Sequence, residues 1–232
     1  MVDTLYLLNA KPRGYIDSMM RTDFVKRLST FEASAKTIIG QLPHTAHSSE
    51  FYQALKNLKI FASELLNLDS KLSTAARDQQ MADNLKWLLS YKYPDEKIIV
   101  WAANNHIMKN SLNSFKKTSS NTGSMGTSFT ANRELASQTY ILGFTSFMGS
   151  SQTVFQKKAF EIPRPKQGFE SWLPREMEFG FLDFKTILSD SISQQAFIMK
   201  ARGHSAVEAN WLKVFDGMFY IRVMMPANLI AK

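Results

Sequence analysis

The sequence has no cysteine among its 232 residues, so disulfides, thiolate zinc sites and a cysteine nucleophile are excluded. No stretch reaches the 18 consecutive apolar residues that a membrane-spanning helix needs. The first residues carry an acid where a signal peptide has bases, and their apolar run is short. We therefore expect a soluble chain without a visible export signal. Its compartment stays open, because a protein without cysteine suits either redox environment.

Four common functional motifs are also missing from the sequence. It has no Gly-x-Ser-x-Gly nucleophile elbow, no phosphate-binding Gly-x-x-x-x-Gly-Lys-Ser/Thr loop, no Gly-x-Gly-x-x-Gly and no His-Glu-x-x-His. His44 and His47 share a loop without a third ligand nearby, which favours exposed loop residues over a metal site. The sequence therefore predicts neither a cofactor nor a metal.

The composition is that of a globular protein, with 44% apolar residues and a formal net charge of +8. The basic residues are scattered, and the densest spots lack interleaved aromatic residues. A solvated surface is therefore favoured over a nucleic-acid site. These spots are Lys116–Lys117, Lys157–Lys158 and Arg164 with Lys166.

Helical periodicity dominates the first 92 residues. Apolar residues recur at spacings of three and four, which predicts helices over residues 17–39, 49–68 and 73–91. A turn follows at residues 93–95. We expect a helical region over residues 1–92.

The pattern changes after residue 97, where an apolar, β-branched run over residues 98–103 predicts a strand buried on both faces. Further strands are expected over residues 138–144, 197–202 and 216–222, with a weaker candidate at 181–184. Residues 116–130 are rich in Ser, Thr, Gly and Asn and predict a long loop. The expected fold is α/β, a central mixed, largely parallel sheet flanked by helices. Residues 93–232 form its sheet-containing region, in one structural domain with the helical part.

His106 is the leading candidate for chemistry, because it follows the predicted strand where open α/β sheets place their ligand crevices. Asn104 and Asn105 add amide groups at the same edge. A neutral imidazole there suits a general base, although a histidine that caps the next segment is an open alternative. Arg77 and Asp78 open the third predicted helix, and an ion pair at the helix end is their favoured interpretation.

Taken together, several motifs resemble the erythromycin esterase family. An arginine-led helix with Met81-Ala82-Asp-Asn84 precedes a strand that leads into Trp101-Ala-Ala-Asn-Asn-His106, and the family has Trp-Ala-His-Asn-x-His at this place. Downstream elements of the family also match in order and spacing, over roughly residues 77–226. They are Met125-Gly126, Gly143-Phe144 with Gly149, and Asn210-Trp211 followed by residues 216–221.

The resemblance implies hydrolysis of a carboxylic ester or lactone, such as that of a macrolide, by an activated water without a covalent intermediate. It implies His106 and Arg77 as catalytic residues, and Asn104, Asn105 and Trp101 as the substrate-binding group. The expected partner is a small-molecule ester, with neither nucleic acid nor membrane.

Two departures from the family pattern qualify this expectation. Ala103 stands at the first histidine of the pair, and the N-terminal Gly-Glu-x-x-His-Gly motif has no match. We therefore expect the C-terminal portion of a longer hydrolase, incomplete here, on which a missing N-terminal segment packs. The alternative is a non-catalytic ligand-binding module on the same scaffold.

Overall fold

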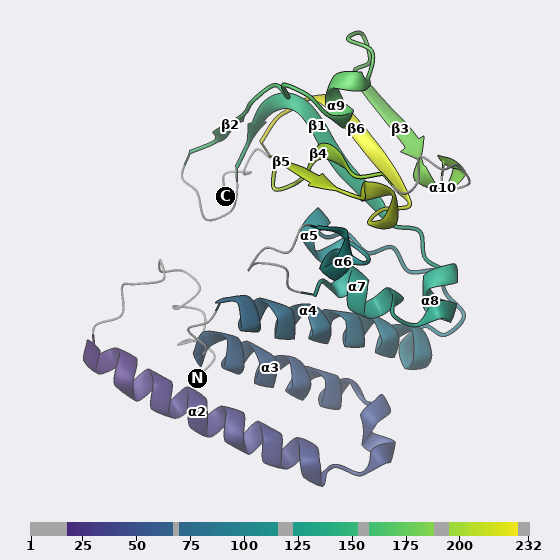
Figure 1. Ribbon diagram of the computed structural model, residues 1–232. Helices are drawn as coiled ribbons and strands as arrows, with labels where there is room; N and C mark the ends of the chain where they lie inside the picture. The colour runs from purple at the N-terminus through teal and green to yellow at the C-terminus, as the bar shows by residue number, and fades with distance from the viewer. Residues whose placement is uncertain (1–17, 67–69, 116–122, 153–157, 188–194, 227–232) are drawn as a thin grey trace, which may run out of the picture. The chain divides into compact units, whose positions relative to one another are not determined.

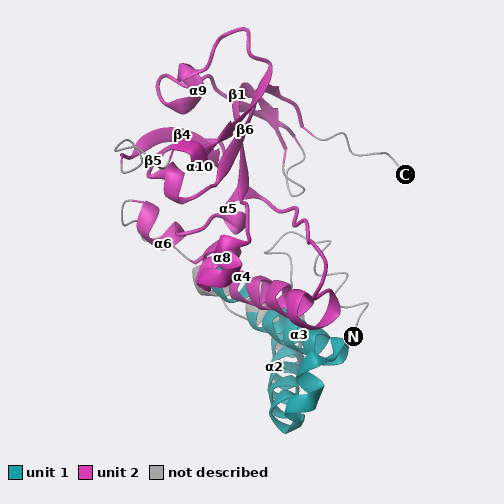
Figure 2. Ribbon diagram, turned by 90° about the vertical axis from the view of Figure 1, so that its right-hand side faces the viewer, with its two compact units in different colours: residues 1–77 teal, residues 78–232 magenta. Residues whose placement is uncertain are grey.

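The computed structural model describes residues 18–66, 70–115, 123–152, 158–187 and 195–226. Two compact units divide the chain, residues 1–77 and 78–232 (Figure 2), and the division falls inside helix α4 (Ser70–Trp87). The division expected after residue 92 stays a prediction. Lys116–Lys117, Lys157 and the first part of the predicted loop lie outside the described residues.

The first unit is a pair of long helices with the start of a third. Helix α2 (Ser18–Gln41) packs against α3 (Glu50–Leu66), and the 3₁₀ turn η1 (His44–Ser48) joins them. Both helices bury small or branched residues, and Ser63 donates a 2.5 Å hydrogen bond to Glu32 across the pair. The predicted helices are confirmed, with ends shifted by one to four residues. Among the described residues, no helix is both long and apolar enough to cross a membrane.

The second unit contains a mixed four-stranded sheet in the order β2-β1-β6-β3 (Figure 1). Strands β1 (Leu142–Ser151) and β6 (Gly217–Met224) form its parallel centre. The edge strands β2 (Phe160–Ile162) and β3 (Phe179–Asp183) pair antiparallel to β1 and β6. The predicted mixed sheet of an α/β fold is confirmed, with parallel pairing confined to the centre.

A second sheet is the hairpin of β4 (Phe197–Arg202) and β5 (Ser205–Ala209). Its turn needs left-handed backbone at two positions, supplied by Gly203 (φ 57°) and His204 (φ 61°). The hairpin lies against β1, together with the short helix α9 (Phe169–Trp172) (Figure 1). The core between them contains the largest fully buried side chains, among them Trp211, Phe215, Met199 and Met218.

Short helices complete the second unit. The end of α4 continues into a π-helical turn, η2 (Leu88–Lys92), and α5 (Asn104–Ile107) and α6 (Ser111–Ser114) follow along the chain. Next come α7 (Met125–Thr130) and α8 (Arg133–Ser137), both before β1. Helix α10 (Phe184–Ile187) directly follows β3 in the chain, and the 3₁₀ turn η4 (Trp211–Lys213) precedes β6.

The strand predicted over residues 98–103 is wrong. The segment has no regular secondary structure, and Ile99 and Trp101 are 93% and 86% exposed. A strand buried on both faces needs a neighbouring strand and two covering layers, and the described residues place no strand beside this segment.

Smaller differences concern element ends and the long loop. The strand expected from residue 138 begins at Leu142, and Phe184 opens α10 instead of closing a strand. The described part of the loop folds into α7, because the Ser124 side chain caps the helix by accepting from the Thr127 N–H. Strands β2 and β5 are short and carry no clear alternation, which is why the sequence pattern missed them.

Candidate functional site

His106 lies in a one-turn helix that begins directly after the segment 98–103. Helix α5 starts after Ala103, whose carbonyl accepts the His106 N–H at 2.8 Å. The His106 side chain is 24% exposed. The imidazole therefore has one side in the protein and a limited opening to solvent, the setting in which a histidine can exchange protons with a bound molecule.

Asp78 is the partner of this imidazole. Its Oδ1 lies 2.7 Å from His106 Nδ1, and its side chain is 4% exposed. Its Oδ2 accepts the Met125 N–H at 3.3 Å. A carboxylate beside Nδ1 favours the tautomer that is protonated there, so the lone pair of the neutral ring resides on Nε2.

The expectation for Asp78 is corrected by this geometry. Helix α4 begins at Ser70, so Asp78 lies in its interior instead of at a helix start, and its structural partner is His106. Sequence reasoning singled out both residues but did not join them, because 28 positions separate them. Arg77 precedes Asp78 in α4 and is half-buried, and its catalytic role stays a prediction.

Gly126 allows α7 to approach Asp78 and His106, the pair of residues that we call the dyad. A Cβ at Gly126 would lie 2.0 Å from the Ile107 carbonyl oxygen and 2.7 Å from that of Met108, so only glycine allows this approach. The contact brings the Met125 N–H to Asp78. Helices α4 and α7 pack through a small buried cluster of Ala82, Met125 and Phe129.

Asn104 acts as an anchor between the dyad's helix and both sheets. Its Nδ2 donates to the Phe144 and Ala201 carbonyls at 2.6 and 2.7 Å, and its Oδ1 accepts the Phe144 N–H at 3.1 Å. The side-chain amide thus pairs with the backbone of β1 as a strand residue would. Substrate binding by Asn104 stays a prediction, and the contacts observed are structural.

Asn105 and Trp101, the other predicted substrate-binding residues, are both exposed. The centroid of the Trp101 ring lies 5.6 Å from that of Phe144, so Trp101 packs against β1 close to Asn104. Asn104, Asn105 and His106 all lie in α5, and Trp101 precedes this helix by three residues. Their contacts with a substrate stay a prediction.

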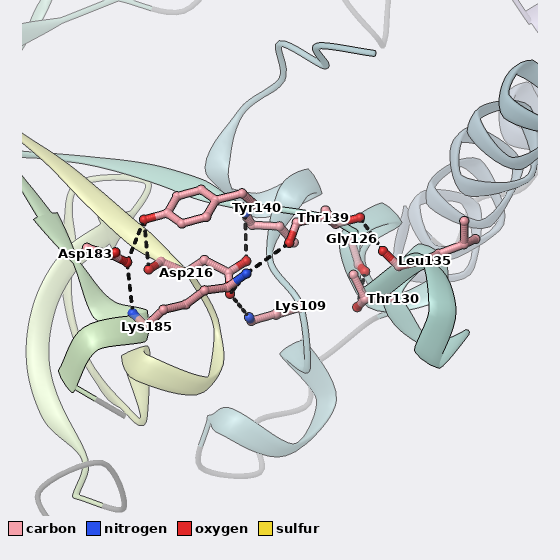
Figure 3. A network of polar contacts seen from close by, with 10 residues as sticks. Lys109, Gly126, Thr130, Leu135, Thr139, Tyr140, Asp183, Lys185 and Asp216 are labelled. Atoms are coloured by element: carbon pink, nitrogen blue, oxygen red, sulfur yellow. Dashed lines mark hydrogen bonds and ion pairs between the residues drawn. The ribbon is translucent and has the colours of Figure 1, made fainter. Parts of the chain in front are cut away.

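A second polar network, which sequence reasoning missed, ties the chain after His106 to the sheet (Figure 3). Asp216 is 2% exposed; its carboxylate pairs with Lys109 Nζ and accepts the Ile141 N–H at 2.8 Å. Lys185 Nζ lies 3.7 Å from the same carboxylate. Because Lys109 is three residues beyond His106, this network fixes the path of the turn that carries the imidazole.

Tyr140 closes the network at its exposed side. Its hydroxyl donates to Asp183 at 2.9 Å and lies 3.2 Å from the Asp216 carbonyl oxygen (Figure 3). Burial, followed by the hydrogen bond to Asp183, raises the pKa of Tyr140 to about 12. The phenol therefore stays protonated at neutral pH and serves as a donor.

The remaining histidines lie elsewhere. His44 is exposed in η1, and the His47 ring stacks on Tyr52 with centroids 4.3 Å apart. Burial, with a smaller effect of the Lys200 charge, lowers the pKa of His204 in the β4–β5 turn. Within the described ranges, no group of three histidine, aspartate or glutamate side chains could hold a metal ion.

Comparisons with known proteins agree on one family. The family model described as "Erythromycin esterase" matches residues 10–224. The Bacillus subtilis (strain 168) protein named "Putative hydrolase YbfO" is 33% identical over 161 residues, which are 66% of this chain and 36% of that protein. The chain thus spans about a third of the length of this curated relative.

Two solved structures are similar. A crystal structure of a succinoglycan biosynthesis protein superposes with a TM-score of 0.62 at 18% identity, over 86% of this chain and 50% of that one. A mutant of the erythromycin esterase EreC in its open conformation gives a TM-score of 0.49 at 16% identity, over 94% and 57% of the two chains. The first of these shows a shared fold.

Proposed function

Because the chain belongs to the erythromycin esterase family, we propose that it is a hydrolase domain that cleaves a carboxylic ester or lactone with a water activated at Asp78 and His106. The family match and the relative's name support a hydrolase-like function in general. The observation that carries the specific proposal is the 2.7 Å contact between His106 Nδ1 and the buried Asp78 carboxylate.

In the proposed reaction, His106 Nε2 takes a proton from water as the hydroxyl oxygen attacks the ester carbonyl carbon. The carbonyl π electrons move to oxygen and form a tetrahedral oxyanion. When this collapses, the ester C–O bond breaks and the leaving alkoxide takes the proton from Nε2. Ester and water become acid and alcohol, and the imidazole is restored.

The proposed roles rest on positions in the site, except that of Arg77, which rests on the family resemblance. Asp78 fixes the tautomer and stabilises the imidazolium that forms during the reaction. Arg77 is the proposed cation for the oxyanion, as the family resemblance implies. Asn104 holds the turn, while Asn105 and Trp101 are the exposed side chains proposed to meet the substrate.

The test is mass spectrometry of a panel of macrolides and simple carboxylic esters incubated with the chain. We expect a substrate to gain one water, and His106→Ala to lower kcat/KM by about 10²–10⁴-fold. His44→Ala is the matched control, because His44 is exposed in η1, and its rate should equal that of the wild type. Hydrolysis that survives in His106→Ala would refute the proposed base.

The second candidate is a ligand-binding module without turnover. Ala103 favours it, because alanine stands where the family pattern has the first histidine of the pair. Calorimetric titration with the same panel separates the two functions. Binding with no water gained in any compound would favour the module over the enzyme.

A further inference from the structure

The four-stranded sheet carries a row of aromatic side chains on one face. Phe144 of β1 pairs in register with Phe219 of β6, which pairs with Phe181 of β3. Residues that pair across strands share a face, so these three rings stand side by side. The Phe144 and Phe219 centroids are 5.6 Å apart, and Tyr140 extends the row with its ring 6.5 Å from that of Phe181.

The two faces of this sheet differ in exposure. On the face toward the hairpin and α9, Met218 and Tyr220 are 0% and 1% exposed. On the aromatic face, Phe181 is 54% exposed and Phe179, two residues earlier on the same strand, is 71% exposed. We call this the aromatic face; its exposed members are Tyr140, Phe144, Phe179, Phe181 and Val223.

The aromatic face is large enough to form the apolar centre of a protein interface. With about 200 Å² for each fully exposed large side chain, its exposed members present about 500 Å² of mainly apolar surface. That is near the upper end for the largest patch on a typical monomer. A standard interface buries about 800 Å² per partner, of which roughly 60% is apolar, so 500 Å² is what its apolar centre requires.

The charge distribution makes the face compatible with itself. The strand residues that point this way alternate from Leu142 to Met148 on β1, from Gly217 to Val223 on β6 and from Phe179 to Asp183 on β3. Of these, Asp183 alone is charged, and it lies at one end, bound to Tyr140. Other charged side chains lie at the margins of the face. Lys185 Nζ is 5.1 Å from the Tyr140 ring centroid, Arg164 Nε is 3.2 Å from Met148 Sδ, and exposed Glu161 on the edge strand β2 pairs with Ser150. Two copies brought face to face therefore set no like charges opposite one another at the centre.

We propose that the aromatic face docks a second copy of this chain. The two sheets pack face to face about 10 Å apart, related by a two-fold axis through the phenylalanine row. Burial of the two rows stabilises the pair, and the exposed edges form its polar rim. None of the five members belongs to the dyad, although the Trp101 ring lies 5.6 Å from that of Phe144 at the border of the face. The dimer is read out by mass and the hydrolytic proposal by turnover, so failure of one is distinguishable from failure of the other.

Sedimentation equilibrium of the full chain tests the proposal. We expect a mass of twice 26.4 kDa at micromolar concentration, and Phe181→Lys should weaken association at least tenfold, because it places two ammonium groups in the apolar centre. Phe51→Lys is the matched control: it removes an exposed phenylalanine on α3, 63% exposed, and should leave the mass unchanged. Circular dichroism checks that each variant folds, and Val223→Lys replaces Phe181→Lys if the latter does not.

Two results would overturn the dimer. One is a monomeric mass up to about 100 µM, which would leave the face for a different polypeptide, such as the N-terminal segment that the family resemblance implies. The other is a folded Phe181→Lys or Val223→Lys that associates as tightly as the wild type.

Discussion

Replacing Gly126 by alanine sets two opposing effects against each other at the dyad. Gly126 is the second residue of α7, and alanine in a helix is worth about 1 kcal/mol more than glycine. Against this, the new Cβ would lie 2.0 Å from the Ile107 carbonyl oxygen, and real Cβ atoms essentially never approach within 3.0 Å. Because the obstacle is backbone, it cannot turn aside, and α7 must move by about 1 Å.

The movement of α7 costs more free energy than the higher helix propensity of alanine supplies. Overpacking of this kind costs about 1–3 kcal/mol, and loss of the hydrogen bond from Met125 N to the buried Asp78 adds about 1–3 kcal/mol. After the helix gain is subtracted, we expect Gly126→Ala to destabilise the fold by about 1–5 kcal/mol. Activity should fall as well, since the displaced helix no longer holds Asp78.

Urea unfolding followed by circular dichroism measures this difference. Gly123→Ala is the matched control, because nothing lies within 4 Å of a Cβ there, and its stability should stay within about 0.5 kcal/mol of the wild type. A Gly126→Ala protein as stable as the wild type would show that α7 does not rest on the Ile107 carbonyl, and the geometry of the dyad would then be wrong.

Three further perturbations probe the site and its surroundings. Asp78→Asn keeps the shape of the side chain but loses the charge that stabilises the imidazolium of His106. Measured by initial rates, kcat should fall by about 10²–10⁴-fold with little change in KM. An unchanged kcat would remove Asp78 from the mechanism. Asn104→Asp loses the amide hydrogen bonds to two backbone carbonyls. It should lower the midpoint of urea unfolding by an amount equivalent to about 2 kcal/mol. An unchanged midpoint would show that these hydrogen bonds do not stabilise the fold. Burial lowers the pKa of His204, so below pH 6.5 the unfolded chain binds more protons than the folded one. The free energy of unfolding of the wild type should therefore decline as the pH falls from 6.5 toward the folded-state pKa. His204→Asn, which tolerates the left-handed backbone, should flatten this part of the pH profile, and an unaltered slope from pH 7 to 5 would contradict the assignment.

Local signals in the sequence explain what could be predicted of the fold. The helices of the first unit follow from apolar residues at regular spacing, and β6 follows from its apolar, aromatic run. The segment 98–103 has the same kind of signal but forms no strand, because a strand depends on neighbours that local sequence does not supply. Its exposed Ile99 and Trp101 show that apolar composition alone does not place a residue in the core.

The candidate site was partly predictable for a similar reason. His106 stood out because of its position after an apolar run, and Met125-Gly126 because of the family resemblance. The contact of His106 with Asp78 depends on tertiary packing of α4, α5 and α7, which no spacing in the sequence encodes. The Asp216 network was missed for the same reason, since its partners belong to segments up to 107 positions apart in the sequence.

The protonation state of the His106 ring nitrogens is the most direct test of the account. Long-range ¹H–¹⁵N NMR correlation spectra distinguish the tautomers of the four histidines at alkaline pH, where imidazoles are neutral, and His106→Ala assigns the relevant signals. We expect a proton on Nδ1 and a lone pair on Nε2 in the wild type, with this preference lost in Asp78→Asn. A proton on Nε2 in the wild type, or the same tautomer in both proteins, would contradict the dyad.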